Sequence, residues 1–294
     1  MPRPELRHML ERGETVLAPG VWDAITARLI KHLGFKCLYI PGSGTGVVMG
    51  ESEPLTTLTQ TTMVAERASE GVGDELPVIV DVMCGYGNPI HVQSTVTTLE
   101  DAGATAIHIE DQLYPGRAHY FRGLEHVVSL AEYQQRIEYA VKARRSRDFL
   151  IIARNDVYHA VEKGTREDAV KRAHAALEVG ADAIFITGDQ GVDDLRYFRR
   201  EVKDVPMAVV GGAGPSGLSV DDYKSMGYQI ILYIATINAS LRAIRDTYLK
   251  VKESGYLPEV SQEQVGEVRD LINGLLGFEE KWAVEASTTE APRS

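Results

Sequence analysis

Val78-Ile-Val-Asp-Val-Met-Cys-Gly-Tyr-Gly-Asn88 is followed along the chain by Ala106-Ile-His-Ile-Glu-Asp-Gln112. Each segment is a short apolar run that stops at an acidic residue. Such runs are typical of parallel strands that are buried on both faces and deliver a carboxylate to the edge of their sheet. The two segments therefore predict two strands whose ends present Asp81 and Glu110.

The same alternation of a short apolar run with an amphipathic helix continues on both sides of these segments. The runs predict strands at 15–20, 37–42, 78–81, 106–110, 149–154, 183–187, 207–210 and 229–234. Helices are predicted at 6–12, 22–33, 57–70, 89–102, 130–143, 166–179, 192–200, 220–226 and 237–253, with a small-residue segment at 43–46. Because the period is regular and no hairpin signal occurs, the pattern favours a closed (β/α)8 TIM-type barrel over an open doubly wound sheet.

The C-terminal part of the chain does not fit this repeat. We predict a barrel catalytic domain over 1–255, a C-terminal helical extension over 256–282 and a disordered tail over 283–294. A helix predicted at 262–275 begins an apolar stripe that a finished barrel does not need. The stripe consists of Leu271, Leu275, Phe278 and Trp282. Burial in the chain's own core and burial against a partner subunit both remain open for it.

Composition narrows the class of protein. The chain has 294 residues, 44% of them hydrophobic, which is enough for one large globular domain. Its net charge of −11 comes from scattered acidic residues, which argues against nucleic acid or an anionic membrane as a partner. Cys37 and Cys84 stand in or beside apolar runs, which predicts buried thiols in a reducing compartment. With no long apolar run or secretion signal, we expect a soluble cytoplasmic protein.

The active site of such a barrel lies at the C-terminal ends of its strands. These ends carry carboxylates, an arginine and small residues: Trp22, Asp23, Ser43, Gly44, Thr45, Asp81, Glu110, Asp111, Gln112, Arg154, Asn155, Asp156, Thr187, Gly211 and Gly212. Carboxylates that repel one another favour a hydrated Mg²⁺ or Mn²⁺ between them. Arg154 offers a bidentate clamp for a substrate carboxylate, and the backbone amides at 43–45 can bind a second carboxylate or an oxyanion.

Each of these residues also has a structural interpretation. Asp81 can cap the following helix, Arg154 can be an ion-pair partner, and Gly85-Tyr-Gly87 is a turn signal first. Their gathering at one end of the barrel favours a site, because chance would scatter them over both ends. The sequence contains no CxxC, HExxH or P-loop pattern.

Six short motifs follow one another in a characteristic order. They are Trp22-Asp-Ala, Ser43-Gly-Thr, Asp81 to Asn88, His108-Ile-Glu-Asp-Gln112 with Pro115, Ile152-Ala-Arg154 and Gly180-Ala-Asp-Ala-Ile-Phe. In this order the chain resembles the isocitrate lyase/phosphoenolpyruvate mutase superfamily over about Val16 to Tyr233. The resemblance implies a (β/α)8 barrel that forms homo-oligomers, dimers or tetramers, by exchanging a C-terminal helix between subunits.

The resemblance also implies a chemistry and a set of site residues. The substrate would be a small 2-oxo or 2-hydroxy dicarboxylate, or a related phosphonate, bound to Mg²⁺ and passing through an enolate. Asp81 matches the direct metal ligand, Glu110 a second carboxylate of the metal shell, and Arg154 the carboxylate-binding arginine. The expected substrate contacts are Trp22, Asp23, Ser43, Gly44, Thr45, Tyr86, Asn88, Arg154 and Thr187.

Three positions depart from the superfamily's patterns. Met83 stands where an Asp-x-Asp pair usually has its second aspartate, which removes a water-mediated metal contact. Ala118 stands where the mobile loop of the lyases has a cysteine acid, and the loop also lacks the asparagine of the mutases. Thr187 replaces a glutamate that many lyases carry on the sixth strand.

Two mechanisms are compatible with the loss of the loop cysteine. Either the reaction needs no loop acid, as in decarboxylation or hydrolysis of a 2-oxo acid, or His119 or Tyr120 donates the proton. Gly116 and Gly123 flank the segment and suggest a lid that also brings Arg117 to the substrate. For His119, a solvent-facing loop position is the alternative.

The hypothesis is therefore a Mg²⁺-dependent carbon–carbon lyase, decarboxylase or hydrolase. A phosphonate P–C mutase or hydrolase is one alternative. A binding protein that has lost catalysis is another, motivated by Met83 and Ala118.

Overall fold

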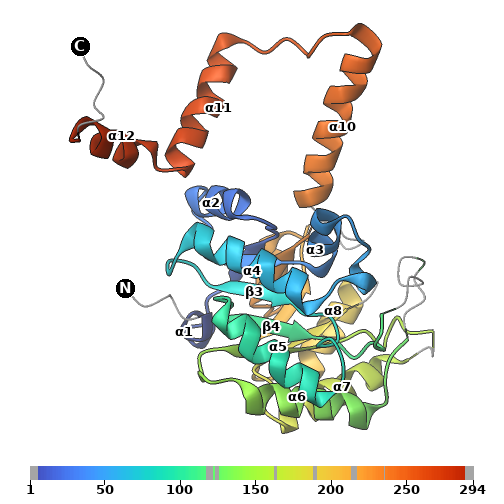
Figure 1. The fold of residues 1–294 in the computed structure, drawn as a ribbon. Helices are drawn as coiled ribbons and strands as arrows, with labels where there is room; N and C mark the ends of the chain where they lie inside the picture. The colour runs from blue at the N-terminus through green and yellow to red at the C-terminus, as the bar shows by residue number, and fades with distance from the viewer. Residues whose placement is uncertain are drawn as a thin grey trace. The chain divides into compact units, whose positions relative to one another are not determined.

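The computed structural model describes residues 6–116, 122, 126–161, 164–187, 191–212, 217–234 and 236–288. The chain divides into two compact units, Met1–Ile237 and Asn238–Ser294 (Figure 1).

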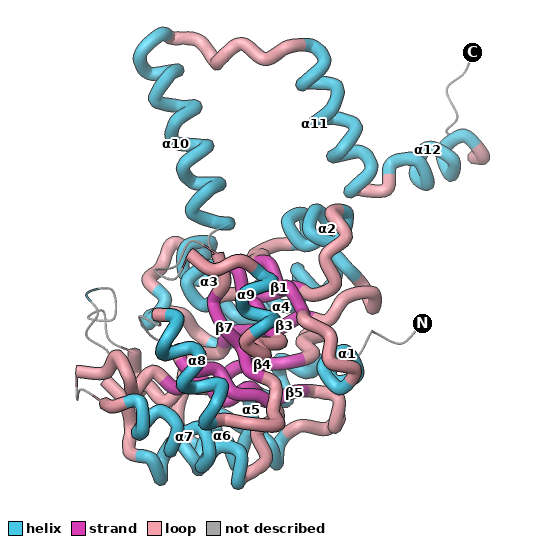
Figure 2. Tube along the Cα trace, turned by 180° about the vertical axis from the view of Figure 1, so that it is seen from behind, coloured by secondary structure: helices cyan, strands magenta, loops and turns pink. Residues whose placement is uncertain are grey.

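Eight parallel strands form a barrel in the first unit, surrounded by helices (Figures 1 and 2). The strands are β1 Val16–Pro19, β2 Leu38–Ile40, β3 Val78–Asp81, β4 Ala106–Ile109, β5 Leu150–Asn155, β6 Ala183–Ile186, β7 Met207–Val210 and β8 Ile230–Tyr233. Neighbours pair in sequence order from β2 to β8, and β8 pairs with β1. A parallel bridge between Gly20 and Tyr39 joins β1 to β2, where the Val21 amide donates to the Tyr39 carbonyl at 2.8 Å. The predicted (β/α)8 barrel is confirmed.

Side-chain caps fix where several of the barrel helices begin. The elements around the sheet are α1 Leu6–Glu11, α2 Ala24–His32, α3 Gly42–Met49, η1 Glu53–Leu55, α4 Leu58–Val72, α5 Pro89–Asp101, α6 Leu130–Ala143, α7 Arg166–Glu178, α8 Val192–Glu201 and α9 Val220–Ser225. Asp23, Thr57, Thr165 and Ser219 each form a reciprocal capping box with the third helical residue. The first residues of these four helices are therefore fixed by local hydrogen bonds.

The strands are buried on both faces. One core cluster includes Ile40, Val80 and Ile107, and the other includes Ile79, Ala106 and Ile152. Because side chains alternate along a strand, every second residue points to the same face. The alternation that places Ile79 and Ile152 in the second cluster continues two residues later to Asp81 and Arg154.

The small-residue segment at 43–46 is not a loop between a strand and a helix, because it lies inside α3. Glycine is usually unfavourable in a helix, so a packing reason must outweigh its low propensity. A Cβ on Gly44 would lie 2.8 Å from Cγ of Pro41, and one on Gly46 would lie 2.9 Å from the Glu51 carbonyl oxygen. These glycines allow close packing within a helix rather than a turn.

The second unit contains most of α10 Thr236–Ser254, together with α11 Gln262–Leu275 and α12 Phe278–Ala286. It begins at Asn238 rather than after 255, because no described residue of α10 after Ile237 is buried. The tail predicted to be disordered from 283 is helical to Ala286, a segment of good helix formers, and 289–294 lie outside the described residues. Within the described part of the chain, no helix has the length and apolarity needed to cross a membrane.

Candidate active site

An arginine lies among carboxylates at the C-terminal end of the barrel. Nη1 of Arg154 lies 3.1 Å from Oε2 of Glu110 and 3.6 Å from Oδ2 of Asp81. Its Nε donates to Oδ1 of Asp156 at 3.1 Å, and its guanidinium lies 5.6 Å from the ring centre of Phe185. All four charged residues are buried. The residues predicted as metal ligands and as the carboxylate clamp are thus brought together.

Backbone amides orient Asp81. Its Oδ1 accepts from the Met83 amide at 2.8 Å, and its Oδ2 accepts from the Gly42 amide at 3.2 Å. The Met83 carbonyl in turn accepts from the Glu110 amide at 2.8 Å, and Met83 has the left-handed φ of 51° that this turn requires. The methionine side chain is buried, with Sδ 3.3 Å from the Thr56 hydroxyl. The residue that lacks a carboxylate therefore still links the two predicted ligands through its backbone.

The pKa values of Asp81 and Glu110 are shifted in opposite directions. Burial raises the pKa of Asp81, but His108, Arg154 and the two amides outweigh it, so that this pKa lies below its ordinary value. Burial lowers the pKa of His108 to about 4, so its imidazole is neutral at pH 7. At that pH the positive charge that lowers the pKa of Asp81 is therefore that of Arg154. Burial, with Asp156 and Asp81, raises the pKa of Glu110 well above its ordinary value despite Arg154. One arginine cannot neutralise all of these carboxyls.

A cavity of about 220 Å³ opens on this cluster. It is lined by Tyr39, Pro41, Ser43, Glu53, Asp81, Arg154, His159, Phe185, Thr187, Val210 and Ile234. Four of these residues, Ser43, Asp81, Arg154 and Thr187, were predicted as site residues. The Thr187 hydroxyl bonds to the Asp156 carboxylate, so it supports the residue that holds the arginine.

The other predicted substrate contacts do not line this cavity. Asp23 caps α2 by accepting from the Thr26 amide at 2.8 Å, and Trp22 packs against the core. Asn88, rather than Asp81, caps α5 by accepting from the amides of Ile90 and His91, so the capping interpretation of Asp81 is wrong.

The remaining predicted contacts also do not line this cavity. The buried Tyr86 hydroxyl lies 2.6 Å from the Thr61 hydroxyl. Gly44 and Thr45 lie on the buried face of α3. The predicted loop residues Arg117, His119 and Tyr120 lie outside the described residues.

Sequence reasoning missed Glu53 and His159. Glu53 begins the 3-10 helix η1, is only 8% exposed, and has Oε1 close to the backbone of Gly42. His159 lies in the turn that follows β5. Neither stands at a strand end, and the only signal for Glu53 is an acidic residue directly before Pro54 in an otherwise polar segment.

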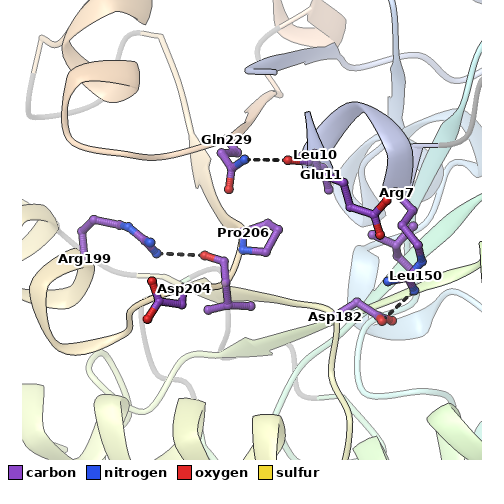
Figure 3. Close-up of a pocket in the computed structure, with 10 residues that line it drawn as sticks. Arg7, Leu10, Glu11, Leu150, Asp182, Arg199, Asp204, Pro206 and Gln229 are labelled. Atoms are coloured by element: carbon purple, nitrogen blue, oxygen red, sulfur yellow. Dashed lines mark hydrogen bonds and ion pairs between the residues drawn. The ribbon is translucent and has the colours of Figure 1, made fainter. Parts of the chain in front are cut away.

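A second, larger cavity of about 320 Å³ lies at the opposite end of the barrel (Figure 3). Its polar groups are engaged in structural contacts: Arg7 pairs with Asp182 at 2.7 Å, and Gln229 donates to the Leu10 carbonyl at 3.1 Å. Arg199 donates to the Val205 carbonyl at 2.9 Å. This end of a barrel serves stability rather than catalysis, so we place the candidate site at the smaller cavity.

An eight-stranded α/β barrel with an arginine held among carboxylates at its strand ends is the architecture of a barrel enzyme. The family model for phosphoenolpyruvate phosphomutase matches residues 6–252. The 2-methylisocitrate lyase of Aeropyrum pernix is 36% identical over 253 residues, covering 85% of this chain and 80% of that protein.

Two further relatives agree along almost the whole chain. The 2,3-dimethylmalate lyase of Eubacterium barkeri is 32% identical over 284 residues and 96% of each chain. A crystal structure of phosphonopyruvate hydrolase in complex with oxalate and Mg²⁺ matches with a TM-score of 0.82 and 28% identity, covering 96% of this chain and 97% of that one. The chain belongs to the phosphoenolpyruvate phosphomutase family, and the predicted superfamily is confirmed.

Proposed function

We propose that the protein is a Mg²⁺-dependent enzyme that makes or breaks a C–C bond next to a carboxylate in a small 2-oxo or 2-hydroxy dicarboxylic acid, through an enolate. The observation that carries the proposal is the buried Arg154, which lines one cavity with Asp81 and lies 3.1 Å from Glu110. Relatives named as carbon–carbon lyases at 32–36% identity support this reaction type.

The donor set fits a magnesium ion. Mg²⁺ in proteins is usually held by one or two carboxylates while it keeps several waters. Asp81 and Glu110 supply two carboxylates, and the cavity of about 220 Å³ has room for water and a small acid. No group of three His, Cys, Asp or Glu side chains suited to a metal occurs among the described residues, so the remaining ligands would be water and substrate. When bound, Mg²⁺ would act as a Lewis acid toward the enolate oxygen.

Arg154 would bind the carboxylate beside the reacting carbon. Asp156, Glu110 and the ring of Phe185 hold its guanidinium from three directions, so little reorganisation is needed when a substrate arrives. A charge fixed in a buried cavity stabilises a developing negative charge more strongly than water does. The Asp81 carboxylate, held by two amides, would keep its orientation during the reaction.

The proton that neutralises the enolate carbon would come from the loop 115–123. We propose His119 or Tyr120 as its donor, with Arg117 adding positive charge, because Ala118 has no proton to give. His119→Ala should then lower kcat on the order of 10²-fold. An unchanged kcat in both His119→Ala and Tyr120→Phe would exclude a loop acid and favour decarboxylation or hydrolysis.

A product screen tests the reaction itself. The purified protein would be incubated with Mg²⁺ and 2-methylisocitrate, 2,3-dimethylmalate, oxaloacetate or phosphonopyruvate, and the products would be followed by NMR. We expect C–C cleavage of at least one dicarboxylate, lost when EDTA removes the metal. Cleavage of phosphonopyruvate alone would assign a P–C hydrolase instead, and Mg²⁺-dependent binding without turnover of any compound would assign a binding protein.

We also propose that the second unit associates with another copy of the chain. Its helices expose large apolar side chains, including Leu241, Ile244, Tyr248, Val265 and Val268, and none of its described residues is buried. Contiguous apolar surface of this kind marks interaction sites. Truncation after Tyr256 should reduce the number of chains per particle in light scattering, and an unchanged number of chains per particle would refute the proposal. Two free, buried cysteines fit the cytoplasm as the location.

A further inference from the structure

His159 lies in a firmly anchored turn. Its backbone amide donates to the Asp156 carbonyl at 2.9 Å. The neighbouring Tyr158 packs edge-on against Phe198, with 5.8 Å between ring centres, and its hydroxyl lies 3.2 Å from Oδ2 of Asp194. The turn is therefore fixed on the side away from the cavity, and the position of the His159 backbone is defined.

The same turn ties His159 to the arginine clamp. Asp156 uses its carbonyl for His159, while its carboxylate accepts from Arg154 and from Gln112. Gln112 donates to Oδ2 of Asp156 at 3.0 Å. The backbone of His159 and the guanidinium of Arg154 are thus both held by one shared, fully buried residue, and both His159 and Arg154 line the cavity.

The imidazole of His159 is available to a ligand. It is half-buried and lines the cavity, and its ring packs only loosely on that of Tyr158, with 6.3 Å between centres. Within the described ranges, neither ring nitrogen has a hydrogen-bond or ion-pair partner. Tyr39 also lines the cavity, but its hydroxyl already has a partner, because it lies 3.0 Å from Nε2 of His108.

A dianionic substrate needs such a donor. Arg154 already faces three carboxylates, which offset its charge, and the same cavity is lined by Val210 and Ile234, which are 37% and 40% exposed. Neither apolar side chain offers a donor, so a second carboxylate beside them would be held only by water unless another protein group donates to it. An imidazole donates a hydrogen bond from a ring N–H in either charge state.

We infer that His159 binds the second carboxylate of the substrate, the one remote from the reacting carbon, and thereby selects dicarboxylic acids over monocarboxylic ones. The inference rests on the proposed function, because it assigns the first carboxylate to Arg154. The ligand class is a short 2-oxo or 2-hydroxy dicarboxylate whose remote end reaches the turn after β5.

Three small acids distinguish binding at the reacting end of the substrate from binding of its remote carboxylate. Oxalate is too short to extend beyond the reacting end, malate carries a remote carboxylate, and lactate is a 2-hydroxy acid without one. Isothermal titration of the full chain in Mg²⁺ would measure each of them against the wild type, His159→Ala, His159→Gln and His174→Ala. His174 is an exposed histidine on α7 and provides the matched control.

We expect His159→Ala to weaken malate binding by roughly 10- to 100-fold, as for loss of a hydrogen bond to a charged group. Oxalate and lactate should bind as to the wild type. His159→Gln keeps an N–H donor and should recover part of the malate affinity, while His174→Ala should change nothing.

Unchanged malate binding in His159→Ala would overturn the assignment. So would an equal loss of oxalate and malate affinity, or a wild type that binds malate no better than lactate. If the wild type binds no oxalate in Mg²⁺, the proposed function fails, and this inference fails with it. Mg²⁺-dependent oxalate binding with no effect of His159 refutes the inference alone.

Discussion

Both ends of the barrel hold a cluster of charged side chains, partly buried at the N-terminal end and buried at the C-terminal end, but the charges are balanced in opposite ways. At the N-terminal end, Asp182 pairs with both Arg7 and Arg144, and its Oδ2 also accepts from the Ile151 amide at 2.8 Å. At the C-terminal end, among the described residues, the guanidinium of Arg154 faces the carboxylates of Asp81, Glu110 and Asp156, while Arg172 pairs with Asp111.

This difference in charge balance supports the choice of the candidate active site better than cavity size does. The larger cavity, of about 320 Å³, lies at the N-terminal end, where cations outnumber the aspartate and stabilise the fold. The smaller one, of about 220 Å³, lies where carboxylates exceed the cation. Buried acidic groups in excess are unfavourable for folding alone, and a divalent cation would relieve their repulsion. We therefore base the proposed site on charge imbalance rather than on cavity volume.

Arg154→Lys should show the largest difference between the ends. Lysine keeps the charge but loses the planar fork that Asp156 and Glu110 hold. We expect kcat/KM for the identified substrate to fall by roughly 10²- to 10³-fold. Arg7→Lys at the other end is the matched control and should leave kcat/KM unchanged. Equal losses in the two variants would remove the distinction between the ends.

Asp182→Ala should act on stability instead. It leaves Arg7 and Arg144 without their shared carboxylate, and these side chains are only 16% exposed. Breaking a largely buried pair should cost about 3 kcal/mol and lower the Tm by roughly 10 °C. Calorimetry gives the Tm, and kcat per folded molecule should stay at the wild-type value. A catalytic defect without destabilisation would show that this end is functional after all.

The smallest expected effect is the pH dependence of stability that His108 contributes. Burial lowers the pKa of His108 from 6.5 to about 4, so between these values the unfolded chain binds a proton that the folded chain does not. Stability should therefore fall as the pH falls from 6.5 to 4, by at most about 3 kcal/mol from this residue.

Urea unfolding at several pH values measures this contribution. The difference between the wild type and His108→Gln isolates it from all other titrating groups. Parallel curves for the two proteins over this range would contradict the assignment of a neutral, buried imidazole.

The fold could be predicted where local patterns determine it. β3, β7 and α6 have the same bounds as predicted, because uninterrupted apolar runs and helical periodicity mark them. The helical state of Gly42–Met49 could not be predicted, because it depends on close packing against Pro41 and Glu51 rather than on propensity. The end of the first unit at Ile237 likewise depends on which helices find a packing surface.

Periodicity predicts the part of the candidate site that lies on strands or directly after them. Asp81 and Arg154 follow from alternation along β3 and β5, Glu110 and Thr187 directly follow β4 and β6, and Ser43 was predicted from its small-residue motif. Glu53 and His159 come from connecting segments, whose position relative to the strand ends is set by tertiary packing. Their contribution to the cavity has no periodic signal in the sequence.

Two predicted substrate contacts, Asn88 and Asp23, also carry a local sequence signal for a helix cap. Asn88 stands directly before Pro89, the pattern of a helix N-cap followed by proline at the first position. Asp23, three residues before Thr26, likewise reads as a cap. Cap chemistry should therefore be assigned before polar strand-end residues are given to a substrate.

The central claim, that metal and acid bind at the C-terminal end around Asp81, is tested most directly by isothermal titration of oxalate. The titration compares the wild type, Asp81→Ala and Asp182→Ala, each with and without Mg²⁺. We predict Mg²⁺-dependent binding in the wild type and in folded Asp182→Ala, and none in Asp81→Ala. Oxalate binding by Asp81→Ala with wild-type affinity, or its loss from a folded Asp182→Ala, would contradict the account.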